Sequence, residues 1–171
     1  MKKYEFTGET KEIRLLFRTA LQLCIRATVA FGIVEVGDLG GWIEKEEILS
    51  HEGKAWVWGN AKVWGNAEVC GDAEVWGNAE VWGNAEVFSA SHVLVIGAIG
   101  SRNDFTTFYR DKDNEITVKC GCFLGKIDRF LEKVTQTHGD SKYALVYRAA
   151  VEVAKLQIDL SGEAPKDADE E

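Results

Sequence analysis

Residues 57–86 repeat one pattern of six residues five times in succession. The hexad reads Val-Trp-Gly-Asn-Ala-Glu; Lys62 ends the first copy in place of glutamate, and the third copy carries Cys70 and Asp72 in place of Trp and Asn. A period this short is too small for independently folding units. It indicates a β-solenoid, in which every repeat adds one strand and one turn. The pattern therefore constrains the architecture of the middle of the chain, although it does not by itself indicate a function.

The order of residues within the hexad predicts which side chains face the interior. Neighbouring residues of a strand point to opposite faces. In the run Glu74-Val75-Trp76 we therefore expect the valine to point inward and the glutamate and tryptophan to point outward. Gly and Asn supply a turn because both tolerate positive φ angles. The alanine that follows is small enough for a crowded interior corner.

The repeat resembles the hexapeptide repeat of left-handed parallel β-helices, in which an aliphatic residue is followed four places later by a small one. The resemblance covers residues 52–88. It implies that three hexads make one triangular coil of about 18 residues and that the repeats build about two coils. Residues 39–51 are expected to add a looser coil. The expected fold class is mainly β: a short left-handed parallel β-helix with an N-terminal β segment and a small C-terminal α+β module.

A coil of this length stacks each residue on the residue one coil further along, at a ladder spacing of about 4.8 Å. The stacking predicts two outward-facing tryptophan columns, and each Trp can bury on the order of 200 Å². Exposed apolar patches of this size mark interfaces. Hexapeptide-repeat proteins are typically homotrimers, so the resemblance implies a homotrimer; the alternative is that the chain's own terminal segments cover the columns. The expected interface residues are Trp58 stacked with Trp76 and Trp64 stacked with Trp82, and the third column is Glu52, Cys70 and Phe88.

Composition excludes several classes of protein. The net charge is −8, which argues against non-specific nucleic-acid binding because that activity needs a basic surface. The chain has no apolar run of about 18 residues, so no membrane span is expected. Its first residues lack the apolar stretch of a signal peptide. We therefore expect a cytoplasmic protein whose four cysteines are reduced.

The flanks of the repeats divide the rest of the chain. Apolar residues at the odd positions of 21–29 predict a strand and make Cys24 a partly exposed thiol. Residues 11–18 fit either a strand or a helical turn. Trp42 is expected to cap the first coil. The expected domains are an N-terminal β segment over 1–38, the β-helix over 39–90, an α+β module over 91–160 and a disordered acidic tail over 161–171.

The C-terminal module is expected to follow a βββαα order. Short runs rich in β-branched and aromatic residues predict strands at 92–96, 105–110 and 116–123. A helical stripe follows, and Gly139 ends that helix in the position after its last turn. The first helix is expected to bury Ile127, Phe130, Leu131 and Val134, and the second, capped by Asp140 or Ser141, to bury Ala144, Tyr147, Val151, Ala154 and Ile158.

Several strings in this module carry a second resemblance. They run Ile99-Gly100-Ser101-Arg102-Asn103-Asp104, Thr106-Thr107-Phe108-Tyr109-Arg110, Cys120-Gly121-Cys122-Phe123-Leu124-Gly125 and Thr137-His138-Gly139-Asp140, and the coils are entered through Gly37-Asp38-Leu39-Gly40-Gly41-Trp42-Ile43-Glu44. Together they are similar to a domain that follows hexapeptide repeats in phage and prophage proteins of mostly unassigned function. The resemblance implies a phage-encoded protein acting in the cytoplasm of a bacterial host.

The loop between the first two strands of the module is a candidate anion site. A glycine-rich loop exposes backbone N–H groups that can cradle an anion, and an arginine can add a bidentate contact to a phosphate. The alternative is an ordinary hairpin loop whose Arg102 pairs with Asp104 or Glu115. The expected ligand-binding residues are Ser101, Arg102, Asn103, Thr106, Thr107 and Arg110.

Other chemistry has weaker support. Acyltransferases are common on hexapeptide repeats and use a histidine as general base, but His51, His92 and His138 all lie outside the repeats. Cys120 and Cys122 share a strand face if the strand is continuous, yet a zinc site needs four ligands, so buried structural thiols are expected instead. Stacked Trp faces are a further possible platform for bases or sugars.

These observations favour a non-catalytic, trimeric binding protein without cofactor or metal that sequesters a small anionic host ligand, such as a cyclic-nucleotide immune signal. A purely structural assembly module and an acyltransferase are the alternatives.

Overall fold

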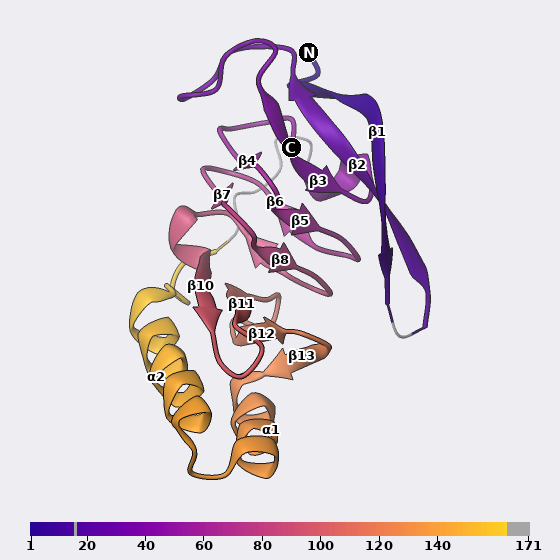
Figure 1. Ribbon diagram of the computed structural model, residues 1–171. Coiled ribbons are helices and arrows are strands. Elements are labelled where there is room, and N and C mark those ends of the chain that lie inside the picture. Colours follow the sequence, from indigo (N-terminus) through magenta and orange to yellow (C-terminus); the bar gives the residue numbers. More distant parts are fainter. Residues whose placement is uncertain (16, 164–171) are drawn as a thin grey trace.

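The computed structural model describes residues 1–15 and 17–163. The protein is mainly β, with two helices at its C-terminal end. A stack of short coils forms the middle, an N-terminal hairpin starts at one end and extends along the side of the coils, and a four-stranded sheet with the two helices forms the other end (Figure 1). Within the described residues, no helix is long and apolar enough to cross a membrane. The expected acidic tail lies largely outside the described residues.

The N-terminal segment is a long antiparallel hairpin. Strands β1 (Tyr4–Arg14) and β2 (Thr19–Ala27) pair with a register shift between Phe6 and Thr10. Residues 11–14, which fitted either a strand or a helical turn, continue β1. Strand β2 also pairs antiparallel with β3 (Leu39–Ile43), which joins the hairpin to the coils.

The hexads form six two-residue strands that pair in parallel with the strand one coil further along. Val57 faces Val75 and Val63 faces Val81, so partners are 18 residues apart (57 to 75, 63 to 81). This register confirms the predicted coil length. The strands are β4 (Trp56–Val57), β5 (Lys62–Val63), β6 (Glu68–Val69), β7 (Glu74–Val75), β8 (Glu80–Val81) and β9 (Glu86–Val87), with pairs β4–β7, β5–β8 and β6–β9.

The valine and alanine of each hexad build the core of the coils. From Val57 to Val87, each of these side chains is at most 2% exposed. The predicted inward orientation of the two residues is therefore confirmed. Burying one valine contributes about 1.5 kcal/mol or more, and the short strands depend on this repeated burial because each has only two paired residues.

Residues 39–51 add the less regular coil that the sequence predicted. Ile43 in β3 pairs in parallel with Val63, and an isolated parallel bridge joins Leu49 to Val69. A short 3-10 helix, η1 (Glu46–Ile48), lies between them. The hairpin and the coils consequently share one sheet, in the order β1-β2-β3-β5-β8.

Trp56 and Tyr4, not Trp42, close the N-terminal end of the coils. Trp56 is fully buried, with its ring edge-on to Tyr4 and to Phe31. The ring of His51 stacks on Tyr4 at 4.4 Å. Trp42 instead lies outside this core cluster, under the ammonium group of Lys11 at 3.8 Å from its ring centroid, so the predicted capping role was wrong.

The alternation predicted for residues 21–29 is wrong for the first half of β2. Leu21 is 47% exposed, whereas Gln22 and Cys24 are buried. The register of β2 against β3 shifts between Cys24 and Arg26, so the buried face changes along the strand. Cys24 is consequently a buried thiol, and the amide of Gln22 has no hydrogen-bond partner among the described residues.

The C-terminal module has one strand more than predicted. A short 3-10 helix, η2 (Ala90–His92), leads into an antiparallel sheet in the order β10-β11-β12-β13. The predicted third strand splits at Gly121, whose φ of +56° turns the chain. Cys120 and Cys122 therefore do not share a strand face, and Cys122 is exposed, not buried. The strands are β10 (Val93–Ile99), β11 (Asp104–Arg110), β12 (Ile116–Cys120) and β13 (Phe123–Lys126).

Helices α1 (Ile127–His138) and α2 (Lys142–Gln157) complete the module. Gly139 follows α1 with a φ of +56°, as predicted for a helix end. All five side chains that α2 was predicted to bury are buried, and Phe130 and Val134 of α1 join them in a second core. The outer face of α2 is unexpectedly apolar: Leu145, Val146, Val153 and Leu156 are all exposed.

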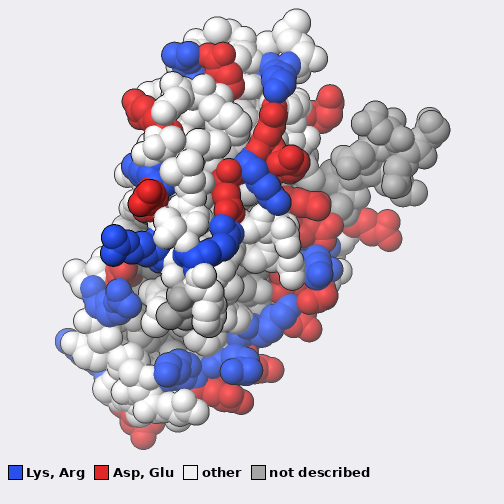
Figure 2. Space-filling view, turned by 90° about the vertical axis from the view of Figure 1, so that its right-hand side faces the viewer, with Lys and Arg blue, Asp and Glu red and all other residues white. Residues whose placement is uncertain are grey.

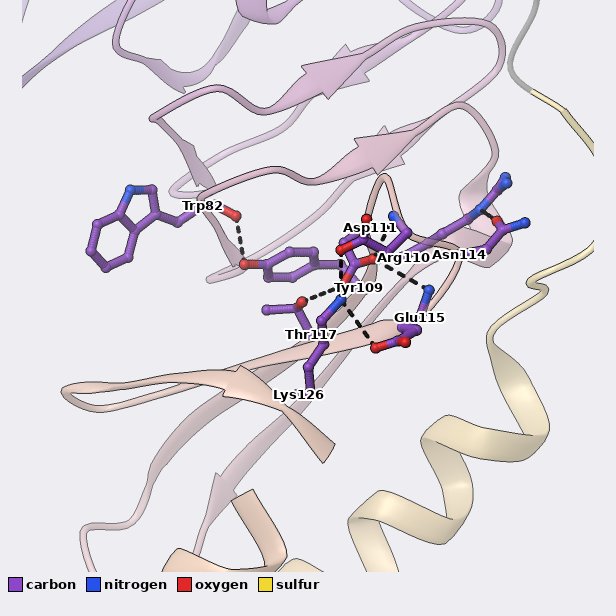
Figure 3. Close-up of polar contacts among 9 residues, drawn as sticks. Trp82, Tyr109, Arg110, Asp111, Asn114, Glu115, Thr117 and Lys126 are labelled. Atoms are coloured by element: carbon purple, nitrogen blue, oxygen red, sulfur yellow. Dashed lines mark hydrogen bonds and ion pairs between the residues drawn. The ribbon is translucent and has the colours of Figure 1, made fainter. Parts of the chain in front are cut away.

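Polar contacts join this module to the last coil (Figure 3). The Tyr109 hydroxyl donates to the carbonyl oxygen of Trp82 at 2.6 Å. Burial raises the pKa of Tyr109 well above its ordinary value, so the hydroxyl keeps its proton. Asp111 bridges to Ala85 through the backbone, and its carboxylate accepts from Thr117 at 2.6 Å and from Lys126.

The carboxylate of Asp111 is 5% exposed. Burial opposes its ionisation, but the bonds from Lys126, Thr117 and two backbone N–H groups outweigh that effect, so the pKa of Asp111 lies below its ordinary value. The charged form is therefore the one that stabilises the joint.

We expect Asp111→Asn to destabilise the protein by about 1.5–3 kcal/mol at pH 7, because the buried side chain loses its negative charge and with it the charge-assisted hydrogen bonds from Lys126 and Thr117, and hydrogen bonds to charged groups are of this size. The folded-state pKa is lower than the unfolded one, so this stabilisation is complete above about pH 4 and is lost as the pH falls through the folded value. Urea unfolding at pH 7 and at pH 2 measures both effects. Asp113→Asn, at an exposed carboxylate near the same lysine, is the control and should change stability little; equal stability of Asp111→Asn and the parent at pH 7 would contradict the account.

Candidate functional site

A groove of about 680 Å³ lies where three parts of the chain converge. One wall is the tip of the β1–β2 hairpin, which extends beside the coils (Figure 1). The floor is the outer face of the β5–β8 column. The second wall consists of the β10–β11 and β12–β13 turns. The groove is lined by Ile13, Arg14 and Leu15 of the hairpin, by Lys62, Trp64, Asn78, Glu80 and Trp82 of the coils, and by Arg102, Asp104, Phe105, Lys119, Gly121 and Cys122 of the module.

The lining has an excess of positive charge. Arg14, Lys62, Arg102 and Lys119 are cationic, and only Glu80 and Asp104 among the lining residues are anionic, which leaves two positive charges in excess (four minus two). The whole chain has a net charge of −8. On this side of the molecule, several Lys and Arg side chains lie side by side at mid-height, with Asp and Glu side chains above and beside them (Figure 2). The groove is thus locally basic on an acidic protein.

Two lysines of the groove share one carboxylate. The ammonium nitrogen of Lys119 lies 3.1 Å from Glu80, and that of Lys62 lies 3.9 Å from it. Lys119 is only 8% exposed, and it also donates to the carbonyl oxygen of Gly121. The Thr107 hydroxyl accepts a hydrogen bond from the backbone N–H of Glu80 at 3.0 Å, which holds the Glu80 backbone in place beside β11.

The aromatic floor is the predicted Trp64–Trp82 column. The two rings stack with centroids 5.8 Å apart and planes 27° apart. Trp64 is 1% exposed, so its ring is not available for contact with another subunit. Of the two alternatives for this column, coverage by the chain itself therefore fits Trp64 better than a subunit interface does. Trp82 is half-buried and keeps part of its ring accessible. A Cβ at Gly65 would lie 2.7 Å from the Trp82 ring, and Gly65 has a φ of +78°, so this turn requires glycine.

The β10–β11 turn places one predicted ligand-binding residue in the groove. Ser101, Arg102 and Asn103 are exposed at this turn, and Arg102 lines the groove. The Arg102 guanidinium lies against Gly121, where a Cβ would be 2.5 Å from it. Among the described residues no carboxylate lies within ion-pair distance of Arg102, so the alternative pairing with Asp104 or Glu115 is not formed.

Three other predicted ligand-binding residues are buried in β11. Thr106 donates to the sulfur of Cys120, and Thr107 accepts from Glu80. Arg110 is 3% exposed; its Nε donates to Asn114 at 2.6 Å, and its guanidinium lies 4.5 Å from the ring centroid of Phe88. The expectation that these side chains face a ligand is therefore wrong, because β11 is an inner strand of the sheet and its side chains are covered.

The sequence analysis missed Arg14, Lys62 and Lys119. For Lys62 a signal was present, since it is the one hexad position where lysine replaces glutamate. Nothing in the sequence connects Arg14 or Lys119 with the coils, because their proximity depends on how the hairpin and the module dock.

The second tryptophan column is half-buried at Trp58 and exposed at Trp76. Trp58 and Trp76 stack with centroids 4.5 Å apart and planes 4° apart, so the predicted stacking of residues one coil apart is confirmed. Trp76 is 47% exposed, and its N–H donates to Glu74 at 3.1 Å. Of the four predicted interface residues, Trp76 is the most accessible.

Of the histidines and cysteines, only Cys122 lines the groove. His51 accepts from the backbone of Lys3, and His92 accepts from the backbone of Phe88. His138 lies on α1 with its ring 5.7 Å from that of Tyr147. The described part of the chain contains no group of three or more His, Cys, Asp or Glu side chains that could hold a metal ion.

A scan of protein-family models finds no match to this chain, and a search of curated proteins finds no relative.

Proposed function

We propose that the protein is a non-catalytic binding protein whose groove holds a small anionic ligand with a flat ring, such as a nucleotide. One observation carries the proposal: an aromatic floor and four cationic side chains line the same groove of an otherwise acidic protein. A volume of about 680 Å³ lies within the range of small-molecule sites, roughly 300–1,000 Å³.

The groups in the groove suit the two halves of such a ligand. Arg102 can donate two parallel hydrogen bonds to a phosphate, and Lys119 adds a largely buried positive charge. The accessible part of the Trp82 ring offers a surface on which a base can stack, a contact worth about 1–3 kcal/mol. Low exposure of the groove floor strengthens these electrostatic contacts relative to open solvent.

The proposal also includes the type of coil and the biological setting of the protein. Parallel pairing at 18 residues supports a left-handed parallel β-helix. The resemblance of the repeats and of the C-terminal module to phage proteins supports a role in the cytoplasm of a bacterial host. There the protein would sequester a host signal such as a cyclic nucleotide and so protect the phage from an immune response.

We expect the purified protein to bind at least one member of a panel of mononucleotides, cyclic nucleotides and NAD-derived signals. Arg102→Ala should weaken that binding about tenfold or more, because one charge-assisted hydrogen bond contributes about 1.5–3 kcal/mol. Isothermal titration calorimetry measures both affinities.

Arg129→Ala is the matched control, since Arg129 is an exposed arginine of α1 outside the groove. It should leave the affinity unchanged. The proposal fails if no member of the panel binds, and the assigned site fails if binding survives Arg102→Ala.

Assembly is the second candidate function, and the exposed Trp76 favours it. We expect a homotrimer formed through the Trp58–Trp76 column, with the exposed apolar face of α2 as a further contact surface. A charged residue at the centre of such an interface is strongly unfavourable.

Light scattering should accordingly give three times the 19.0 kDa chain mass for the parent protein and the single-chain mass for Trp76→Lys. Arg102→Ala should keep the parent's mass. A monomeric parent protein would remove the assembly proposal and leave the binding proposal intact.

A further inference from the structure

We propose that Glu80 is a specificity-determining residue of the groove: its carboxylate neutralises part of the positive charge of the two lysines and so limits the advantage of a doubly charged ligand over a singly charged one. This inference rests on the proposed binding function. It assigns to Glu80 a role that the glutamates at the same position of the other hexads do not share.

Glu80 is held between cations from two distant parts of the chain. Lys62 is its direct partner in the β5–β8 pairing, so the coil register itself places this lysine beside it. Lys119 comes from β12 of the C-terminal module and lies 3.1 Å away. Every hexad after the first ends in glutamate, yet among the described residues only Glu80 of these glutamates forms an ion pair.

The burial of Lys119 makes its anionic partner important. A lysine that is 8% exposed loses much of its hydration, and an anion or several hydrogen bonds must compensate. In the free protein Glu80 and the carbonyl of Gly121 do so. A ligand phosphate that approaches Lys119 and Lys62 must therefore take over the role of the Glu80 carboxylate or share the lysines with it.

Charge counting shows what this competition selects. The Glu80 carboxylate repels every anion that enters the groove, and it repels a ligand with two negative charges about twice as strongly as a ligand with one. Arg102 and Arg14, which also line the groove, attract the doubly charged ligand more strongly in the same proportion. Removing the charge of Glu80 therefore favours the doubly charged ligand. At an effective dielectric constant near 20, one unit charge about 4 Å away changes the interaction substantially, enough for a difference of about tenfold in affinity.

The test compares AMP, which carries close to two negative charges at pH 7.5, with 3′,5′-cyclic AMP, which has the same base and one charge. Titration calorimetry at constant ionic strength gives the affinity of each probe for the parent protein, for Glu80→Gln and for Glu68→Gln. Glu68 has the same hexad position on another face and does not line the groove, so Glu68→Gln is the matched control.

We expect the parent protein and Glu68→Gln to prefer AMP by about tenfold or more. Glu80→Gln should bind both probes more tightly than the parent does, and the affinity for AMP should rise about tenfold more than the affinity for cyclic AMP, so that the preference for AMP widens. Glu80→Asp, whose shorter side chain retreats from Lys62, should lie between the two and covers the case in which Glu80→Gln does not fold.

A preference for AMP that is unchanged or narrower in both Glu80 variants, with parent binding that still depends on Arg102, overturns the role of Glu80 and leaves the binding function standing. If the parent protein binds neither probe, nor pyrophosphate as a probe without a base, both the function and this inference fall together.

Discussion

The structure depends on the stacking of each hexad directly upon the hexad one coil away. Each strand contains only two paired residues, which is too few to be stable alone. The 18-residue register brings Val57 under Val75 and Val63 under Val81, and the buried valines and alanines form a continuous core. The same register stacks Trp58 with Trp76 and Trp64 with Trp82 on the outside. A single repeating length thus sets both the hydrophobic core and the aromatic surface.

The groove exists because two further parts of the chain dock on this stack. The hairpin continues the β5–β8 sheet through β3 and brings Arg14 beside the coils. The C-terminal module is fixed to the last coil by the Tyr109–Trp82 hydrogen bond and by Asp111. That attachment holds β12, and with it Lys119, against Glu80. The candidate site therefore forms only when the hairpin and the C-terminal module are both docked on the coils.

Sequence patterns predicted what depends on local periodicity and missed what depends on docking. The hexads predicted inward Val and Ala, the coil length and the Trp stacking, because each follows from a fixed repeat. The pattern of Ala144, Tyr147 and Val151 likewise predicted the buried face of α2. A register shift in β2 reversed the expected exposure of Leu21 and Cys24, and no local signal marks such a shift.

The candidate site was predicted in part for the same reason. Arg102 was identified from a glycine-rich loop, and it lines the groove. Thr106, Thr107 and Arg110 instead lie on an inner strand, and both faces of that strand are covered. Their burial could be inferred only with the coils docked on one face of this sheet and the two helices on the other. Lys62 carried a readable signal as the exception in an acidic repeat, whereas Lys119 became relevant only through its 3.1 Å contact with Glu80.

A crystal structure of the protein with AMP would show whether this groove binds an anionic ligand with a flat ring. We expect the base to lie against the exposed part of the Trp82 ring and the phosphate to lie within hydrogen-bond distance of Arg102 and Lys119. AMP bound elsewhere on the protein, with the groove occupied by solvent alone, would contradict this expectation.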